Sequence, residues 1–210
     1  MYTREYSLKK DSEKNITPYI KVKEVKCKDG TDYIKMDQVI CSIISYAREK
    51  FGKPVTITSG YRTANYNSKV DGSATDSRHI KGLAIDHYIS GVSLYDLANI
   101  YYSFGLIRIK VYNSFLHADT DTSPMWLVNS KGFQKVNLNF LGRNFSVKTN
   151  NKDYQVALIQ WKLNKLGFNC GSEDSIFGNK TTIAVKSFQK SKGLSQDGVV
   201  GINTWNKLFN

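Results

Sequence analysis

The sequence of 210 residues predicts an α+β domain followed by a small all-α domain. In the first part of the chain, up to about residue 128, segments with helical patterning alternate with short β-rich runs, which is typical of an α+β domain. In the last part, of about 60 residues, amphipathic helical segments alternate with glycine-containing loops, which indicates three helices. We therefore expect domains at residues 1–136 and 151–210, joined by a linker at 137–150.

Two helices are expected in the first domain. The first spans residues 36–52, where Asp37 can cap the start, apolar residues recur at helical spacing and Gly52 ends the pattern. The second spans residues 93–105, with a capping box at its start and a glycine at its end. Both helices are amphipathic, so each should place one face on a shared core.

Short strands should separate and follow these helices. The β-rich runs are bounded by turn residues or by the ends of the helices, and one of them, "GLAIDHYI", is apolar enough to be buried. The expected β-rich segments are residues 53–62, 82–89, 106–112 and 114–119.

The C-terminal part carries a weak internal repeat. After a polar, Asn-rich connection at residues 137–152, an amphipathic helix, a glycine end and an Asp-x-x-x-Gly loop recur with a period of roughly 20–25 residues. The two loops read "DSIFG" and "DGVVG". The expected core residues of this three-helix unit are Ile159, Leu163, Val185, Phe188 and Trp205.

Charge is the strongest compositional signal. A formal net charge of +12 favours polyanionic partners, such as nucleic acid, anionic lipid or the phosphate-rich polymers of a bacterial wall. The charge is spread along the chain without a basic tail or an arginine-rich helix, so general solubility with weak anion attraction remains an alternative. No nucleic-acid motif and no aromatic-basic stripe is present, which argues against nucleic-acid binding.

Cysteine usage and the N-terminal segment bear on the compartment. Cys27, Cys41 and Cys170 are odd in number and lack CxxC spacing, so we expect buried structural thiols and synthesis in a reducing compartment. The N-terminal segment has no apolar core of a signal peptide, and no run approaches 18 apolar residues. We therefore expect cytoplasmic synthesis without a signal peptide and no membrane partner.

The segment "SRHIKGLAID" holds a candidate half of a metal site. A mononuclear zinc enzyme needs three protein ligands and an open position. Gly82 lets the chain turn between His79 and Asp86, and His117 in "SFLHAD" can supply the third ligand from another strand. Two histidines and an aspartate suit hydrolysis, in which the metal activates water and polarises the scissile carbonyl. From the residues alone, a hydrogen-bonded loop or core histidine is an equal alternative for His79.

Three segments, "SGYRTANYN", "SRHIKGLAID" and "SFLHAD", in this order resemble the signature of the M15 family of zinc D-alanyl-D-alanine peptidases. The resemblance covers roughly residues 18–128. It implies zinc on His79, Asp86 and His117, hydrolysis of peptide bonds in peptidoglycan stems, and a small antiparallel sheet flanked by helices. The fixed positions of the motif Ser-x-His-x-x-Gly-x-Ala-x-Asp are matched by Ser77, His79, Gly82, Ala84 and Asp86.

Of three substrate-binding candidates, the resemblance implies roles for two, Arg62 and Ser77. Arg62 matches an arginine that in relatives faces the substrate carboxylate or steadies the site, and a guanidinium fork suits carboxylate recognition. A structural salt bridge beside the metal ligands is its alternative role. Ser77 can bond either the substrate or the backbone of its own loop. Tyr112 can stabilise an oxyanion.

The sequence departs from the family at the general base. Many relatives carry Glu, Asp or His two or three residues before the last zinc histidine, where this chain has Phe115 and Ser114. Asp119 is the nearest carboxylate and shares the strand face of His117, so we expect Asp119 to be the base. Asp121 and His87 are weaker candidates, and His87 should point to the opposite face of its strand.

The C-terminal unit resembles the peptidoglycan-binding type 1 domain, a three-helix module that anchors proteins to the wall. The resemblance spans nearly the whole unit and includes the pattern "DGVVGINTWNKL". It implies that peptidoglycan is the partner of the chain, and the positive charge would add anionic wall polymers. Tethering to the wall would raise the effective concentration of substrate.

Together these features predict a monomeric, zinc-dependent peptidoglycan endolysin that cuts a stem-peptide bond, with L-Ala–D-Glu as the expected bond. Such an enzyme would accumulate in the cytoplasm and reach the host wall during phage lysis. Two alternatives stay open. One is a bacterial D-Ala–D-Ala carboxypeptidase. The other is a zinc-stabilised wall-binding protein without catalysis, which the missing acidic residue or histidine before His117 favours.

Overall fold

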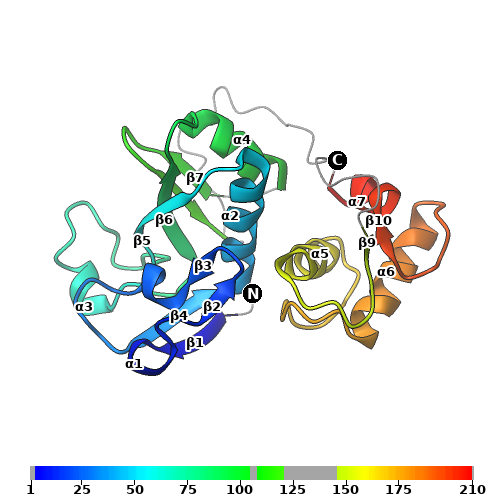
Figure 1. Ribbon diagram of the computed structural model, residues 1–210, viewed down its shortest axis with the longest axis horizontal. Helices are drawn as coiled ribbons and strands as arrows, with labels where there is room; N and C mark the ends of the chain where they lie inside the picture. The colour runs from blue at the N-terminus through cyan, green and yellow to red at the C-terminus, as the bar shows by residue number, and fades with distance from the viewer. Residues whose placement is uncertain (1–2, 105–107, 121–145, 210) are drawn as a thin grey trace.

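The computed structural model of the chain describes residues 3–104, 108–120 and 146–209 (Figure 1). An α+β half precedes a mainly helical half, and every paired strand in the described ranges is antiparallel. The predicted fold class is therefore confirmed.

The largest sheet has four strands in the order β5-β6-β8-β7. Because a residue in one strand lies directly opposite its register partner in the next, side chains far apart in the sequence share one face of the sheet. Each strand lies within one of the four predicted β-rich segments. The strands are β5 (Val55–Ser59), β6 (Ala84–Ile89), β7 (Arg108–Val111) and β8 (Leu116–Asp119).

Helix α2 (Gln38–Phe51) is the central helix of the fold. The Asp37 carboxylate accepts a hydrogen bond from the Val39 N–H at 2.9 Å, and Gly52 ends the helix with a φ of 62°. The predicted start and stop are both confirmed. Nearly every residue of its first three turns is buried, because α2 lies between the first half and the helices of the second half (Figure 1). Helix α4 (Leu94–Phe104) packs on the sheet and on α2.

Several short elements lie outside the sequence-based expectations. Strands of two to five residues with charged side chains, and helices of a single turn, carry too little periodic signal to be recognised. In the structure β1 pairs with β4 and β2 pairs with β3. These elements are β1 (Thr3–Ser7), α1 (Leu8–Asp11), β2 (Asn15–Thr17), β3 (Ile20–Lys21), the 3-10 helix η1 (Val22–Val25), β4 (Tyr33–Asp37) and α3 (Ala64–Asn67).

The second half contains the three predicted helices, α5 (Tyr154–Lys165), α6 (Asn179–Ser191) and α7 (Ile202–Phe209). It also contains a strand pair, β9 (Ser146–Val147) with β10 (Val200–Gly201), so part of the expected linker pairs with the helical unit. The five expected core residues are each at most 1% exposed: Ile159, Leu163, Val185, Phe188 and Trp205. Within the described ranges, no helix is both long and apolar enough to span a bilayer.

The internal repeat is visible as two matching hydrogen-bond sets, each made by a glutamine side chain with an aspartate and a threonine that follow it; we call each set a bracket. In the first, the Gln160 amide of α5 donates to the Asp174 carboxylate in the following loop at 2.9 Å and to the Thr181 hydroxyl in α6 at 3.1 Å. The second bracket has the same bonds and is formed by Gln189, Asp197 and Thr204. Both Asp-to-Asp and Thr-to-Thr spacings are 23 residues, within the predicted period.

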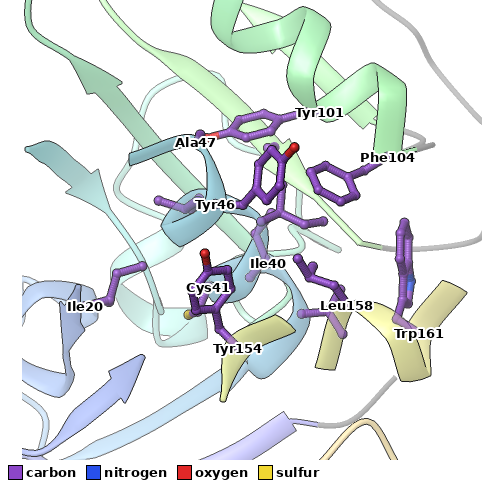
Figure 2. Close-up of a cluster of buried hydrophobic side chains, with 14 of the residues drawn as sticks. Ile20, Ile40, Cys41, Tyr46, Ala47, Tyr101, Phe104, Tyr154, Leu158 and Trp161 are labelled. Carbon is purple, nitrogen blue, oxygen red and sulfur yellow. The ribbon is translucent and has the colours of Figure 1, made fainter. Parts of the chain in front are cut away.

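The two halves share one continuous apolar core. Side chains from α2, α4 and α5 gather in a single cluster (Figure 2). The Tyr46 ring on α2 stacks with Trp205 of α7, with centroids 6.3 Å apart and planes 13° apart. Phe104 of α4 meets Phe209 of α7 edge to face at 5.3 Å. The helical unit therefore packs on the first half through buried aromatic side chains and is not connected to it by the linker alone.

The three cysteines are buried and free, as predicted. Cys41 lies near the start of α2, where burial raises the pKa of its thiol well above the ordinary value. The Cys170 thiol donates to the Gln160 carbonyl at 3.2 Å, and burial raises its pKa to about 12. Raised pKa values leave these thiols protonated and unreactive, which suits a structural role.

Candidate metal centre

The sheet register brings two of the three predicted metal ligands together. Asp86 on β6 lies directly opposite His117 on β8, so their side chains stand next to each other on one face. His79 reaches the same point from the turn before β6. That turn needs Gly82, which has a φ of 70° and lies so close to β4 that an added Cβ would come within 2.3 Å of the Lys35 carbonyl oxygen.

Three donor atoms converge at this point. His79 Nε2 lies 3.2 Å from Asp86 Oδ1 and 3.2 Å from His117 Nδ1, and Asp86 Oδ1 lies 2.7 Å from His117 Nδ1. In a tetrahedral zinc site, bonds of 2.0–2.2 Å separate ligand atoms by about 3.3 Å. Two of the three separations lie within about 0.1 Å of this value, and the Asp86–His117 separation is about 0.6 Å shorter. The donor set suits zinc, and these residues form a candidate metal cluster within the described part of the chain.

Neighbouring groups hold two of the donors in place. His79 Nδ1 donates to the Gly60 carbonyl at 2.7 Å, which leaves the Nε2 lone pair directed at the cluster. The second carboxylate oxygen of Asp86 accepts a hydrogen bond from the Arg62 guanidinium at 2.8 Å. Arg62 is held in turn by the Ser59 hydroxyl at 2.9 Å. These contacts fix the side chains of His79 and Asp86, and leave a lone pair on His79 Nε2 and on Asp86 Oδ1 for a metal.

The electrostatics of the cluster favour a charged Asp86. Burial alone would raise the pKa of this carboxyl, but the hydrogen bond from His117 and the adjacent His79 ring outweigh it and hold the pKa well below the ordinary value. For His117, burial would lower the pKa, but hydrogen bonds to Asp119 and Asp86 outweigh it and raise the pKa to about 9. A cation bound at the cluster would displace the proton that Asp86 and His117 share.

Asp119, the predicted general base, lies behind His117. Its carboxylate is 1% exposed, and Oδ2 lies 3.3 Å from Nε2 of His117, the ring nitrogen opposite Nδ1. A carboxylate on the outer nitrogen of a metal-binding histidine orients the ring and raises its basicity. The geometry thus gives Asp119 a positioning contact, while its role as general base stays a prediction.

Asp119→Asn separates these two roles. If Asp119 orients His117, the variant should bind zinc about 10- to 100-fold more weakly, because an amide cannot hold the imidazole as a carboxylate does. Zinc titration with a competing chelator measures this, and hydrolysis is measured at saturating zinc. Unchanged zinc affinity with lost hydrolysis would favour the role of general base instead, and full hydrolysis with zinc bound would remove the base assignment.

The cluster opens into a cavity of about 420 Å³ that the three predicted substrate-binding residues also line. Arg62 is engaged in the ion pair with Asp86, the geometry of a residue that steadies the site. In Ser77, the backbone carbonyl accepts a hydrogen bond from the Ile80 N–H. Tyr112 is 38% exposed and stacks on Phe115 at 4.4 Å. Their substrate roles stay predictions, and the alternative base Asp121 lies outside the described residues.

Two cationic residues of this cavity were not identified from the sequence. Arg108 lies opposite Asp119 and Lys110 lies opposite His117 in the β7–β8 register, so both stand on the face that carries the metal cluster. The alternation of cations in "RIKV" was the available signal, because residues two apart in a strand share a face. The cavity therefore combines a candidate metal cluster with a cationic wall.

His87 points away from the cluster, as predicted. It is fully buried, and its Nε2 contacts the Tyr101 hydroxyl of α4 at 2.6 Å. Burial lowers the pKa of His87 to about 4. The imidazole is thus part of the packing between the sheet and α4, not of the metal site.

This lowered pKa predicts a pH dependence of stability. In the unfolded chain His87 takes up a proton near pH 6.5, whereas in the fold it does so near pH 4. Its contribution is fully present above pH 6.5 and is lost as the pH falls towards 4, for a total of about 3 kcal/mol. Chemical denaturation between pH 4 and 7.5 measures it. If the unfolding free energy of His87→Gln changed with pH as steeply as that of the wild type, His87 would not be the source of the pH dependence.

The fold and the site together define a class: a small α+β protein with a His–Asp–His cluster suited to zinc, joined to a helical module. A family model described as Peptidase M15 matches residues 15–119, half of the chain, and one described as Putative peptidoglycan binding domain matches residues 152–208. The chain belongs to the peptidase M15 family and carries a peptidoglycan-binding domain after it. The predicted resemblances are confirmed, in the expected order.

Similar proteins include the peptidoglycan L,D-endopeptidase MepK of Escherichia coli K12, 32% identical over 80 residues, which are 35% of this chain and 44% of MepK. A protein of Kitasatospora aureofaciens, described as an uncharacterized protein in the bpoA1 3′ region, is 47% identical over 54 residues, 25% of this chain and 46% of that protein. A crystal structure of a peptidoglycan-binding protein from Clostridioides difficile in complex with glutamine hydroxamate is 43% identical, with a TM-score of 0.31, and covers 32% of this chain and 42% of that one. The chain thus spans less than half the length of these relatives.

Proposed function

We propose that the protein is a zinc-dependent peptidase that hydrolyses a peptide bond in peptidoglycan stems. The observation that carries the proposal is the convergence of His79 Nε2, Asp86 Oδ1 and His117 Nδ1 within 3.2 Å of one another at the end of a cavity. Membership of the peptidase M15 family and the peptidoglycan-binding domain support the reaction type and the substrate class.

Zinc would be held by His79, Asp86 and His117. When bound, it would supply Lewis-acid polarisation of the scissile carbonyl and a source of nucleophilic hydroxide at neutral pH. The side chains around it keep the donors ready: Gly60 fixes the tautomer of His79, and Arg62 holds the second oxygen of Asp86. The fit rests on the donor chemistry and spacing, since soft thiolates are absent from the cluster and two imidazoles with one carboxylate suit zinc.

The remaining residues of the cavity would handle the peptide. Tyr112 projects its exposed ring beside the cluster, where a phenol can donate to a developing oxyanion. Ser77 lines the same cavity, and its backbone is hydrogen-bonded within its own turn, so its hydroxyl could bond the peptide. Arg62 steadies Asp86 directly, so any contact of Arg62 with substrate would use its remaining guanidinium nitrogen. Asp119 holds the outer nitrogen of His117 and remains the proposed proton acceptor.

We propose L-Ala–D-Glu as the bond. This bond joins an L to a D residue, the type named in the relative MepK. A D-Ala–D-Ala carboxypeptidase and a non-catalytic wall-binding protein are the competing functions. The peptidoglycan-binding domain would hold the enzyme on the wall, and the net charge of +12 would add attraction to anionic wall polymers. Action at a host wall as a monomeric phage endolysin, after cytoplasmic synthesis, is part of the same proposal.

Mass spectrometry of purified peptidoglycan digested with the protein tests the proposal. New N-terminal D-Glu and C-terminal L-Ala on stem fragments are the expected products. Release of free D-alanine would instead identify the carboxypeptidase. Binding to walls without new amine termini, with zinc present, would identify the non-catalytic protein. Clearing of a turbid wall suspension is the expected companion result for an endolysin.

A further inference from the structure

A second cavity lies between the two halves of the chain, away from the metal cluster. Its volume is about 500 Å³. One wall comes from β2, the following turn and the start of α2, and the other comes from the start of α5 and the first Asp-x-x-x-Gly loop. Neither the peptidase motif nor the core of the helical unit explains this space.

Two buried polar atoms from opposite walls of this cavity have no hydrogen-bond partner among the described residues. One is Oε1 of Gln38, whose side chain is 2% exposed and donates from its nitrogen to the Ile16 carbonyl. The other is the hydroxyl of Ser175. Buried polar atoms are nearly always satisfied, and exceptions mark bound water or ligand. Two such atoms around one cavity indicate a polar occupant.

Ser175 also occupies a strained backbone position. Its φ is 66°, a region that side chains other than glycine rarely adopt. The internal repeat supplies a comparison within the same chain, because the equivalent residue of the second bracket is Gly198, with a φ of 75°. Both residues donate their backbone N–H to the glutamine of their bracket, Gln160 and Gln189. The first loop therefore keeps a hydroxyl where backbone conformation alone favours glycine, and that hydroxyl lines the cavity.

The charge and polarity of the lining define the class of occupant. Arg4 and Lys152 are offset by Asp153 and Asp174, so the lining has no net charge and does not select an anion. Ile16, Pro18, Tyr154 and Ile176 add apolar surface. A neutral ligand with hydroxyl or amide edges and an apolar face fits this mixture, and a sugar ring has that character.

We propose that this cavity between the two halves binds an acetamido sugar of the wall glycan. Gln38 Oε1 would accept a hydrogen bond from the acetamido N–H or a ring hydroxyl, and the Ser175 hydroxyl would bond the sugar from the opposite wall. This inference rests on the proposed function, which makes the wall the substrate, but the site itself does not involve the metal cluster. It would place the glycan strand against both halves of the chain at once.

Titration calorimetry of the full chain with the neutral tetramer of N-acetylglucosamine tests the proposal. Wild-type protein should bind the tetramer, and Ser175→Ala, which removes only the hydroxyl, should bind it about fivefold more weakly. Ser172→Ala is the matched control, because Ser172 is exposed in the same loop and does not line the cavity. It should bind as the wild type does.

Ser175→Gly separates a ligand contact from a structural role. This variant should raise the melting temperature, because glycine adopts a φ of 66° without strain, and yet weaken sugar binding as Ser175→Ala does. A higher melting temperature with unchanged sugar affinity would overturn the proposal, as would no binding by the wild type or a crystal structure with only water in the cavity. Hydrolysis of a soluble, sugar-free stem peptide should be unchanged in both variants. If the wild-type protein did not hydrolyse this peptide at all, the proposed peptidase function would be refuted instead.

Discussion

Replacement of His79 by alanine should abolish zinc binding and lower peptide hydrolysis by at least about a thousandfold. His79 is one of three converging donors, and its Nε2 is oriented by the Gly60 carbonyl, so its loss leaves a bidentate site. A bound metal would supply several kcal/mol of stabilisation to the transition state, and each 1.4 kcal/mol corresponds to a tenfold change in rate. Calorimetric zinc titration and hydrolysis of a soluble stem peptide measure the two effects.

His87→Gln is the control for this variant. His87 is the residue after Asp86 but faces Tyr101 on the other side of the sheet, so its replacement should leave zinc affinity at pH 7.5 unchanged. A His79→Ala protein that retained zinc at wild-type affinity, or hydrolysed the peptide at more than a tenth of the wild-type rate, would contradict the assignment of His79 as a ligand.

Trp205→Ala should lower the free energy of unfolding by about 4 kcal/mol. Trp205 is fully buried, stacks on Tyr46 of α2 and lies 4.1 Å from the Phe209 ring, so truncation would leave a cavity at the contact between the two halves. Such a loss is a large fraction of the stability of an ordinary domain. Equilibrium denaturation with urea measures this loss, with far-ultraviolet circular dichroism as the probe because its signal does not depend on the tryptophan.

Ile183→Ala on α6 is the matched control, because Ile183 is 56% exposed and its truncation leaves no cavity. It should change stability by less than about 0.5 kcal/mol. Wild-type protein should unfold in one transition, since the two halves share one core. Two separate transitions in the wild type, or a small effect of Trp205→Ala, would show that the halves do not depend on each other.

The long periodic elements were predictable from the sequence, and the short ones were not. Helix α2 carries a capping Asp37, a helical run of apolar residues and a terminal Gly52, so three independent local signals agree. Strands such as β2 and β3 have two or three residues, and their pairing depends on contacts made by the rest of the fold. The shared core with Trp205 could not be predicted, because helical patterning shows which face is apolar but not what covers it.

The metal cluster was predictable to the extent that a resemblance supplied the pairing of distant segments. The residues alone offered His79, Asp86 and His117 as a possible set, and the family resemblance favoured it over an ordinary loop or core histidine. The β6–β8 register then placed His117 opposite Asp86. The contacts that hold the donor side chains in place could not be predicted from the sequence. Gly60 acts through a backbone carbonyl, which every residue has, and the contact of Asp119 with His117 depends on side-chain geometry.

We propose that hydrolysis depends on a metal held by His79, Asp86 and His117. The most direct test follows peptide hydrolysis by the full chain while zinc is removed with a chelator and then restored in known amounts. We expect activity to disappear with the metal and to return in proportion to added zinc, with saturation at one ion per chain. Asp86→Asn should not regain activity when zinc is restored. Full hydrolysis by metal-free protein would contradict it.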